Sequence, residues 1–503
     1  MPIDLSNQLH YLLALLPETV LAAWAMLVLL VDVFQKGDRS EPSSPAILWL
    51  TLAGIGLAAI ANGWLLTLTE VTSTGMIAID SFRVFTNYLF LLAAALFVLI
   101  SARYLDQENM RLAEVFVLVL MAVVGMMAFT GSRDLMVVFL GLELMSLPIY
   151  VLTGVNRRDR RSAEAALKYF LLGAFSSAIF LFGIALVYGG TGTVNIGILA
   201  QTLGADGIGV SPLVLVGMTL LAVGFAFKVS AVPFHMWTPD AYEGAPAPVT
   251  GFMAVAVKAA GFIAFVRVFL TAFPGLYETW GGMIYWLAAI TMVAANVVAL
   301  SQANVKRMLA YSSIAHAGYL LVALAAASTL GAASSLFYLL VYTFMTVGAF
   351  AVVLIVGREG EAHLDLESYS GLAWRRPLLG VTMTVFLLSL AGFPLTGGFI
   401  AKVYVLQAAV ERDLLSLAVV LVLASLVSYW YYLRVAWYMW FRESPDGATD
   451  TRIVTSPAMR VALVVSVIGI LLLGIFPGAV LEMAARSANS LLGATTGMVG
   501  IVP

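Results

Sequence analysis

The chain is a long series of apolar stretches, each close to the length that crosses a lipid bilayer as a helix. A membrane-spanning helix needs roughly 17–25 apolar residues, and the 503-residue sequence divides into fourteen stretches of about this kind. Because lipid offers the backbone no hydrogen-bond partners, such stretches fold as helices. The sequence therefore predicts an all-α polytopic membrane protein. The predicted spans are residues 11–33, 46–68, 82–101, 112–130, 134–154, 164–189, 212–234, 248–272, 281–300, 305–326, 333–356, 377–410, 415–441 and 458–478, and the twelfth is overlong.

Composition excludes several classes of function. Hydrophobic residues make up 62% of the chain and charged residues 11%, so no soluble domain is expected. A formal net charge of -2 offers no basic surface for nucleic acid. The chain has no cysteine, which excludes disulfides and cysteine-ligated iron–sulfur clusters, and its four histidines are not spaced to hold haem or metal. We therefore expect no redox cofactor and no metal on this chain.

Basic residues are distributed unequally between alternate connections. With fourteen spans, the odd-numbered connections hold thirteen arginines and two lysines, whereas the even-numbered connections and the two tails hold only Arg133, Arg412 and Arg486. Cytoplasmic loops carry the excess of lysine and arginine. This pattern predicts that both termini lie outside the cytoplasm. The first span follows Asp4 and not a basic segment, so we expect it to be retained and not cleaved as a signal peptide.

Four of the six lysines interrupt predicted spans: Lys168, Lys228, Lys258 and Lys402. A cation near the bilayer centre costs at least ~2.5–3.5 kcal/mol, so it normally faces protein or water and marks ion traffic. Glu143 lies at similar depth in another span. Buried amines and a buried acid together indicate a line for charge transfer.

Two of these residues, and two histidines that are further candidates for proton transfer, also have a purely structural interpretation. Lys168 follows an arginine cluster closely enough to reach the cytoplasmic surface, and Glu143 could pair with a buried lysine only to hold helices together. His316 is either a hydrogen-bonded core histidine or a relay group. His235, placed at the cytoplasmic end of its span, is either a proton entry group or a loop anchor.

Two spans contain residues that break helices. Lys228 precedes Pro233 in LLAVGFAFKVSAVPF, and Gly392 and Pro394 precede Lys402 in LLSLAGFPLTGGFIAKVY. Open backbone hydrogen bonds are tolerated in a membrane only beside protein or water, and paired broken helices are typical of transporters with internal repeats.

The spacing of the two breaks predicts two five-helix repeats. An odd number of helices makes successive copies inverted in the membrane. The expected segments are an N-terminal three-helix segment (1–111), a first repeat (112–272), a second repeat (281–441) and a C-terminal helix with a tail (442–503).

At residues 233–262, PFHMWTPDAYEGAPAPVTGFMAVAVKAAGF resembles the signature of the proton-pumping membrane family shared by respiratory complex I and multisubunit cation/proton antiporters. GLELMSLPIYVL at 141–152 and LAGFPLTGGFIAKVYVL at 390–406 are similar to the subunit N family of proton-translocating NADH–quinone oxidoreductases. The resemblance covers the whole chain.

The resemblance implies roles for matching residues. Glu143 matches the acid of the fifth span, Lys228 the lysine of the broken seventh, Lys258 that of the eighth and Lys402 that of the broken twelfth; Lys168 and His316 match polar positions of a central hydrophilic axis. It also implies a bacterial inner membrane, other membrane subunits as partners, and FMN and iron–sulfur clusters in those partners.

The buried lysines and Glu143 predict proton translocation, with energy that a single ion pair does not supply. A Glu143–Lys228 pair about 7 Å apart is worth roughly 2.4 kcal/mol at an effective dielectric of about 20, whereas moving one charge against about 150 mV costs roughly 3.5 kcal/mol. Either several stations act together or a partner's redox chemistry supplies energy. Two alternatives remain: a subunit of a multisubunit Na⁺/H⁺ antiporter, and a structural membrane scaffold whose buried charges only set helix register.

Overall fold

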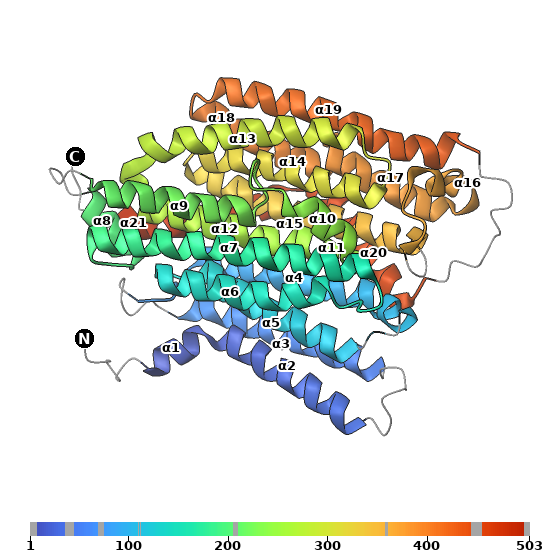
Figure 1. The fold of residues 1–503 in the computed structure, drawn as a ribbon, viewed down its shortest axis with the longest axis horizontal. Coiled ribbons are helices and arrows are strands. Elements are labelled where there is room, and N and C mark those ends of the chain that lie inside the picture. The colour runs from blue at the N-terminus through green and yellow to red at the C-terminus, as the bar shows by residue number, and fades with distance from the viewer. Residues whose placement is uncertain are drawn as a thin grey trace.

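The protein is a bundle of long helices that run side by side (Figure 1). The computed structural model describes residues 8–35, 45–68, 75–108, 110, 112–204, 210–357, 361–443 and 455–496. Apart from isolated β-bridges, the secondary structure of these residues is helical, which confirms the all-α prediction.

The long helices account for most of the described chain. Up to residue 272 they are α2 (Leu16–Gln35), α3 (Pro45–Trp64), α4 (Ser81–Gln107), α5 (Leu112–Gly131), α6 (Leu135–Thr153), α7 (Arg160–Thr191), α9 (Pro212–Lys228) and one helix made of three consecutive pieces, which are α11 (Ala247–Phe252), the π-helical turn η3 (Met253–Val257) and α12 (Lys258–Ala272). The short helix α10 (Trp237–Gly244) lies between α9 and α11 in the sequence. Beyond it they are α13 (Tyr277–Leu300), α14 (Val305–Ala325), α15 (Thr329–Gly357), α17 (Pro377–Ala391), α18 (Gly397–Glu411), α19 (Leu415–Phe441), α20 (Pro457–Ile475) and α21 (Gly478–Thr496). The shorter elements are α1 (Gln8–Ala14), η2 (Leu65–Thr67), α8 (Ile196–Gly204), η4 (Pro274–Leu276), η6 (Leu366–Tyr369) and α16 (Leu372–Arg375).

Twelve helical segments of the described chain are long and apolar enough to cross a membrane. Two shorter apolar helices, α9 and α17, fall on the two spans predicted to be interrupted. Residues 229–236 separate α9 from α10, and residues 392–396 separate α17 from α18, so both predicted interruptions are confirmed. The count of fourteen crossings and the assignment of inverted repeats stay predictions.

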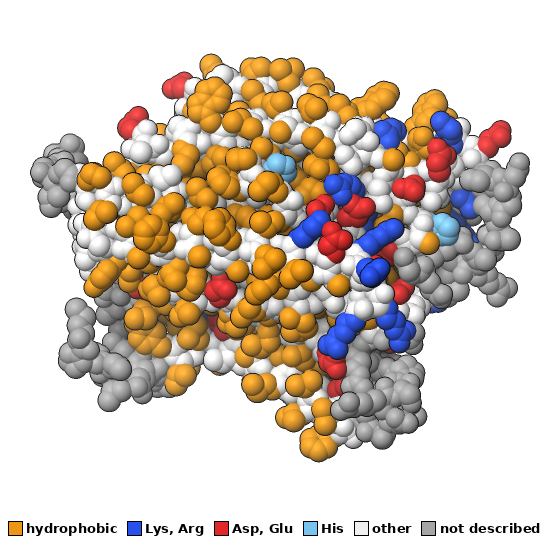
Figure 2. Space-filling view, viewed as in Figure 1, with side chains coloured by type: hydrophobic (Ala, Val, Ile, Leu, Met, Phe, Trp, Pro, Cys, Tyr) orange, Lys and Arg blue, Asp and Glu red, His pale blue; other side chains and the backbone are white. Residues whose placement is uncertain are grey.

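Connections alternate between the two ends of the bundle as the arginine pattern predicts. Backbone bridges between Ile77 and Ser132 and between Asp134 and Asn195 join the connections that follow α3, α5 and α7. A bridge between Asn304 and Asp365 joins those that follow α13 and α15. Charged side chains gather toward one end of the face shown in Figure 2, the right-hand end at which α16 lies in Figure 1. We call this the arginine-rich end.

The C-terminal segment differs from the prediction of one helix followed by a tail. After α20, a second 19-residue helix, α21, packs against α15 and α4 and lies at the opposite end of the bundle from α20 (Figure 1). Ser490 of α21 accepts a hydrogen bond from the Phe82 amide at the start of α4. Hydropathy misses this helix because it carries Glu482 and Arg486, an exposed i,i+4 ion pair.

Glycine pairs bring neighbouring helices close together. A Cβ on Gly141 would meet the Phe129 backbone, so α5 and α6 touch almost backbone to backbone. A Cβ on Gly183 would lie 2.9 Å from the carbonyl oxygen of Gly217, which closes α7 on α9 in the same way. Small residues allow the approach through which membrane helices gain packing energy.

The centre of the bundle is formed by the helices that carry the polar residues. The most apolar stretch of Ala247–Ala272 is 100% buried and that of Val305–Ala325 is 94% buried, compared with 33% for Arg160–Thr191. Side chains on α12 and α14 therefore face protein on every side, and a charge there needs a partner within the bundle.

Ion pairs anchor the end opposite the arginines. Asp80 caps α4 by accepting a hydrogen bond from the Arg83 amide, and both of its oxygens bind Arg267 of α12, at 2.8 and 2.9 Å. Burial raises the pKa of Asp80, but the charge and hydrogen bonds of Arg267 outweigh burial and leave this pKa below its usual value. Arg83 in turn binds Glu18 of α2 at 2.6 Å. These pairs join α2, α4 and α12.

Candidate functional site

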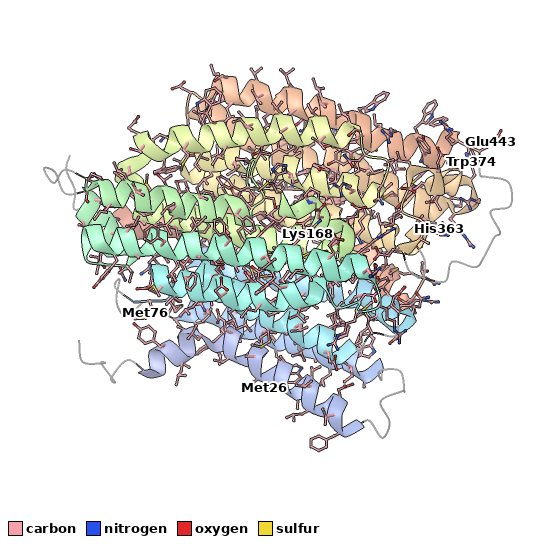
Figure 3. All side chains as sticks on the ribbon, viewed as in Figure 1. Met26, Met76, Lys168, His363, Trp374 and Glu443 are labelled. Atoms are coloured by element: carbon pink, nitrogen blue, oxygen red, sulfur yellow. The ribbon has the colours of Figure 1, made fainter. Side chains whose placement is uncertain are left out.

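Lys168 lies apart from the other embedded lysines. Its ammonium binds Glu164 at 2.8 Å and Asp240 at 2.9 Å, and its side chain is 46% exposed. Figure 3 shows it on α7 beside α10. Its placement in a buried relay is therefore not supported, and it matches the alternative of a lysine that reaches the surface.

Lys228 is the last residue of α9 and is buried. Its Nζ donates to Ser146 Oγ of α6 at 2.8 Å and to the Tyr169 hydroxyl of α7 at 3.5 Å. The break follows at once, with Ser230 at a φ of 66°. A cation is favoured at a helix C-terminus, where backbone carbonyls carry partial negative charge.

Glu143 lies on α6, three residues before Ser146, and one of its carboxylate oxygens is buried without a hydrogen-bond partner. Among the described ion pairs, none within 4 Å joins it to Lys228, although its charge acts on that lysine. Lys228 thus contacts a neutral hydroxyl next to an unpaired carboxylate.

Lys258 begins α12 directly after the π-helical turn η3. It is 1% exposed, and its Nζ donates to the Ser313 carbonyl at 2.6 Å and also contacts the Ser313 hydroxyl. Single π turns occur frequently at functional sites. Lys258 therefore joins α12 to α14 in the most buried part of the bundle.

Lys402 lies on α18, after the second break, and reaches back across it. Its Nζ donates to the Ala391 carbonyl at the end of α17, at 2.8 Å, and lies 4.9 Å from the centre of the Tyr319 ring. Lys228 belongs to the helix before its break, whereas Lys402 belongs to the helix after it. The two lysines are therefore not at equivalent backbone positions: Lys228 is itself the last residue of the half-helix before its break, whereas the ammonium group of Lys402 binds the last carbonyl of the half-helix before the other break.

His316 lies on α14 between Lys258 and Lys402. One hydrogen bond joins its Nδ1 to the Tyr338 hydroxyl at 2.5 Å, and another joins its Nε2 to the Tyr432 hydroxyl at 3.1 Å. Tyr432 also bonds Ser312, the neighbour of Ser313. The charges of both lysines act on this imidazole. One face of α14 thus carries a row of polar groups from Lys258 toward Lys402.

His235 lies in the break between α9 and α10, and its Nδ1 is buried without a hydrogen-bond partner. The sequence placed it at the cytoplasmic end of a span. In the structure, α10 separates it from that end, because Gly244 at the end of α10 meets the Arg161 backbone at the start of α7. The predicted position at the cytoplasmic end is therefore not supported: the break lies one short helix away from the arginine-rich end, and Pro233 and Met236 beside His235 are exposed.

The hydroxyl partners of the lysines were missed by the sequence-based prediction. They are Ser146, Tyr169 and Ser313. The hydroxyl partners of His316, which are Tyr338 and Tyr432, were missed as well, and all five residues are buried. Their only signal in the sequence is a hydroxyl inside an apolar span, which is common and carries little information. Within the described residues, no group of three or more His, Asp or Glu side chains is placed to hold a metal ion.

A buried row of lysines, hydroxyls and a histidine inside a helical membrane bundle is typical of membrane proteins that translocate ions. Comparison with known families agrees, since residues 132–428 match the transmembrane family described as NADH:quinone oxidoreductase/Mrp antiporter. This range contains Glu143, His316 and the three buried lysines Lys228, Lys258 and Lys402, and it ends just before Tyr432.

Curated relatives identify one family within this class of membrane proteins. The chain is 46% identical to the NADH-quinone oxidoreductase subunit N of Trichlorobacter lovleyi over 94% of this chain and 96% of the relative. It is 44% identical to that of Salinibacter ruber over 95% of this chain and 97% of the relative. The chain belongs to the NADH-quinone oxidoreductase subunit N family.

A solved structure of respiratory complex I contains a similar chain. This protein matches a chain of the complex from Thermus thermophilus with 35% identity and a TM-score of 0.75, over 93% of this chain and 99% of that one.

Proposed function

We propose that this chain translocates protons as a membrane subunit of an NADH-quinone oxidoreductase, along a row formed by Glu143, Lys228, Lys258, His316 and Lys402. The names of the curated relatives support the assignment to this complex. The observation that carries the route is the polar face of α14, which contacts Lys258 through Ser313 and Lys402 through Tyr319.

The described hydrogen-bond partners of Lys228, Lys258 and Lys402 are neutral. Lys228 donates to hydroxyls, Lys258 to a serine and Lys402 to a backbone carbonyl. An ammonium held by neutral acceptors can give up its proton without leaving a buried carboxylate unpaired, which is the costly outcome when an ion pair loses one member. Lysine suits this role, whereas arginine effectively cannot lose its proton.

Glu143 acts as the modulator of Lys228 in this proposal. A carboxylate nearby favours the protonated lysine, so approach of Lys228 to Glu143 retains its proton and return to Ser146 favours its release. One such exchange supplies roughly 2–3 kcal/mol, less than the roughly 3.5 kcal/mol needed to move a charge against about 150 mV. The remaining energy comes from redox chemistry in partner subunits that hold FMN and iron–sulfur clusters.

The proposal also covers placement in the cell. The arginine-rich end faces the cytoplasm, both termini lie on the periplasmic side of a bacterial inner membrane, and the partners are other membrane subunits of the complex and the lipid bilayer. The chain contributes to an NADH:quinone oxidoreductase without a redox site of its own.

Alanine substitution of Lys228, Lys258 or Lys402 tests the function. In inverted membrane vesicles, each variant should keep an assembled complex but lose much of its NADH-driven proton pumping. Lys168→Ala is the matched control and should pump normally, because Lys168 is a surface residue. Normal pumping by all three variants would contradict the proposal, and loss of assembly alone would favour the scaffold.

The antiporter alternative has a separate test. Proton movement that depends on sodium and proceeds without NADH or quinone would favour a Na⁺/H⁺ antiporter subunit.

A further inference from the structure

A polar cavity of about 710 Å³ lies at the arginine-rich end. Its wall includes Glu108, Asn156, Gly244, Asn304 and Asp365, which come from five different inter-helix connections or the helix ends beside them. The wall carries five carboxylates and two guanidinium groups. An acidic cleft of this kind raises the local concentration of cations, including protons.

One carboxylate of this wall also belongs to a buried ion pair. Glu361 Oε2 accepts a hydrogen bond from Lys306 Nζ at 2.6 Å, and Glu361 Oε1 accepts from the Ala247 amide at 2.6 Å and from the Tyr104 hydroxyl at 3.0 Å. The Glu361 side chain is 13% exposed and that of Lys306 is 1% exposed. Glu361 therefore separates the cavity from a lysine inside the bundle.

The backbone of Glu361 is also unusual, with a φ of 50°. Residues other than glycine persist in the left-handed region where surrounding contacts hold them there, and such residues cluster at functional sites. The contacts with Lys306, Ala247 and Tyr104 supply that constraint.

Polar groups continue from Lys306 toward Lys258. Lys306 Nζ also donates to the Ala245 carbonyl at 2.5 Å. Three residues earlier, the buried hydroxyl of Tyr242 lies in hydrogen-bonding range of Ser313, the residue that contacts Lys258. Lys306 and Ser313 are two turns apart on α14, about 10 Å. The order from the cavity inward is thus Glu361, Lys306, Tyr242, Ser313 and Lys258.

We propose that the cavity is the mouth of a proton uptake route to Lys258 and that Glu361 is the first proton acceptor of the protein on this route. The inference rests on the proposed function and adds to it the point of entry and two residues, Glu361 and Lys306. In one cycle, Glu361 takes up a proton from the cavity as Lys306 passes its own proton inward toward Tyr242 and Ser313, so that no buried carboxylate is left charged beside a neutral lysine. Glu361 then gives its proton to Lys306. Both groups then return to their starting charges, and one proton has moved inward.

A purely structural role makes different predictions for the same residues. Glu361 caps α11 and neutralises Lys306, so the pair could serve only to hold α11 against α14. In that case the loss of one charge is harmful, but removal of both charges restores the bundle, because no buried charge is left unpaired. A route that uses both residues is not restored by the double substitution.

The experiment measures protons pumped per NADH oxidised by the complete complex in inverted vesicles. Glu361→Gln should lower this ratio as much as Lys258→Ala does, and the double variant E361Q/K258A should be no worse than Lys258→Ala alone, since both block one route. E361Q/K306M should assemble and still pump poorly. Glu278→Gln, at an exposed carboxylate in the first turn of α13 outside the cavity wall, is the control and should pump normally.

Two outcomes would overturn the inference. Recovery of normal pumping in E361Q/K306M would assign the pair a structural role, and normal pumping by Glu361→Gln would exclude it as an acceptor. If Lys258→Ala loses pumping while Glu361→Gln does not, the proposed function stands and only the entry point is wrong. If Lys258→Ala pumps normally, the proposed function itself fails.

Discussion

At the scale of single residues, the three buried lysines near the bundle centre have different surroundings from the buried arginines. Arg83 and Arg267 are held in ion pairs with carboxylates at one end of the bundle. Lys228, Lys258 and Lys402 donate to neutral oxygens near its centre. A paired arginine keeps a fixed charge, whereas a lysine on neutral partners can change its charge when the local field changes.

The hydroxyl of Tyr432 offers a test at this scale, because it joins Ser312 to His316. Tyr432→Phe keeps the ring and removes the only atom that makes both contacts. We expect proton pumping to fall by about tenfold, the effect of ~1.4 kcal/mol on a rate, while the complex still assembles. The control is Tyr404→Phe, since the described contact of Tyr404 is a ring contact with Phe337. Equal pumping by both variants would exclude Tyr432 from the route.

At the scale of helices, each break places a helix C-terminus deep inside the bundle. Lys228 ends α9, and Lys402 binds the last carbonyl of α17 from the far side of the second break. The partial negative charge of a helix C-terminus stabilises a cation by typically 0.3–1 kcal/mol when exposed and up to about 2 kcal/mol when partly buried. The two breaks, although different in sequence, thus each associate a lysine with the C-terminus of a half-helix.

The second break depends on a close contact with α20. A Cβ on Gly474 would lie 2.6 Å from the carbonyl carbon of Thr396, which is closer than backbone atoms allow. Gly474→Ala should therefore displace the break that precedes Lys402, lower the free energy of unfolding by about 1–3 kcal/mol, and reduce pumping. Gly478→Ala is the control, because nothing lies within 4 Å of a Cβ there. Thermal unfolding of the purified complex would measure the difference, and equal stability of the two variants would contradict it.

At the scale of the whole molecule, the two ends of the bundle differ in charge and in their polar features. One end carries most of the arginines and the large polar cavity, whereas the other carries the buried pairs of Glu18, Arg83, Asp80 and Arg267. The proposed orientation, with the arginine-rich end in the cytoplasm, rests on this asymmetry, because positive loops are retained there.

The absence of cysteine in the sequence allows a direct test of this orientation. Arg157→Cys and Gln201→Cys place single thiols in exposed positions at the two ends. A membrane-impermeant maleimide should label Gln201→Cys in spheroplasts, where the outer membrane is removed, and Arg157→Cys in inverted vesicles. Labelling of both from the same side would refute the predicted topology.

Local properties of the chain were enough to predict an all-α membrane bundle, the alternation of its connections and its two interruptions, and to single out Lys228, Lys258 and Lys402, which are buried. Their role in proton translocation stays a proposal. Hydropathy, loop charge and helix-breaking residues act through the immediate solvent, so the sequence expresses them directly. Packing decided the rest. Lys168 reaches the surface and Lys228 does not, because α7 and α9 present different faces to the bundle, and α21 exists because Ala484, Ala488 and Leu491 are buried against its neighbours. The hydroxyls that surround His316 come from α14, α15 and α19, and only folding brings such distant residues within hydrogen-bonding distance of one another.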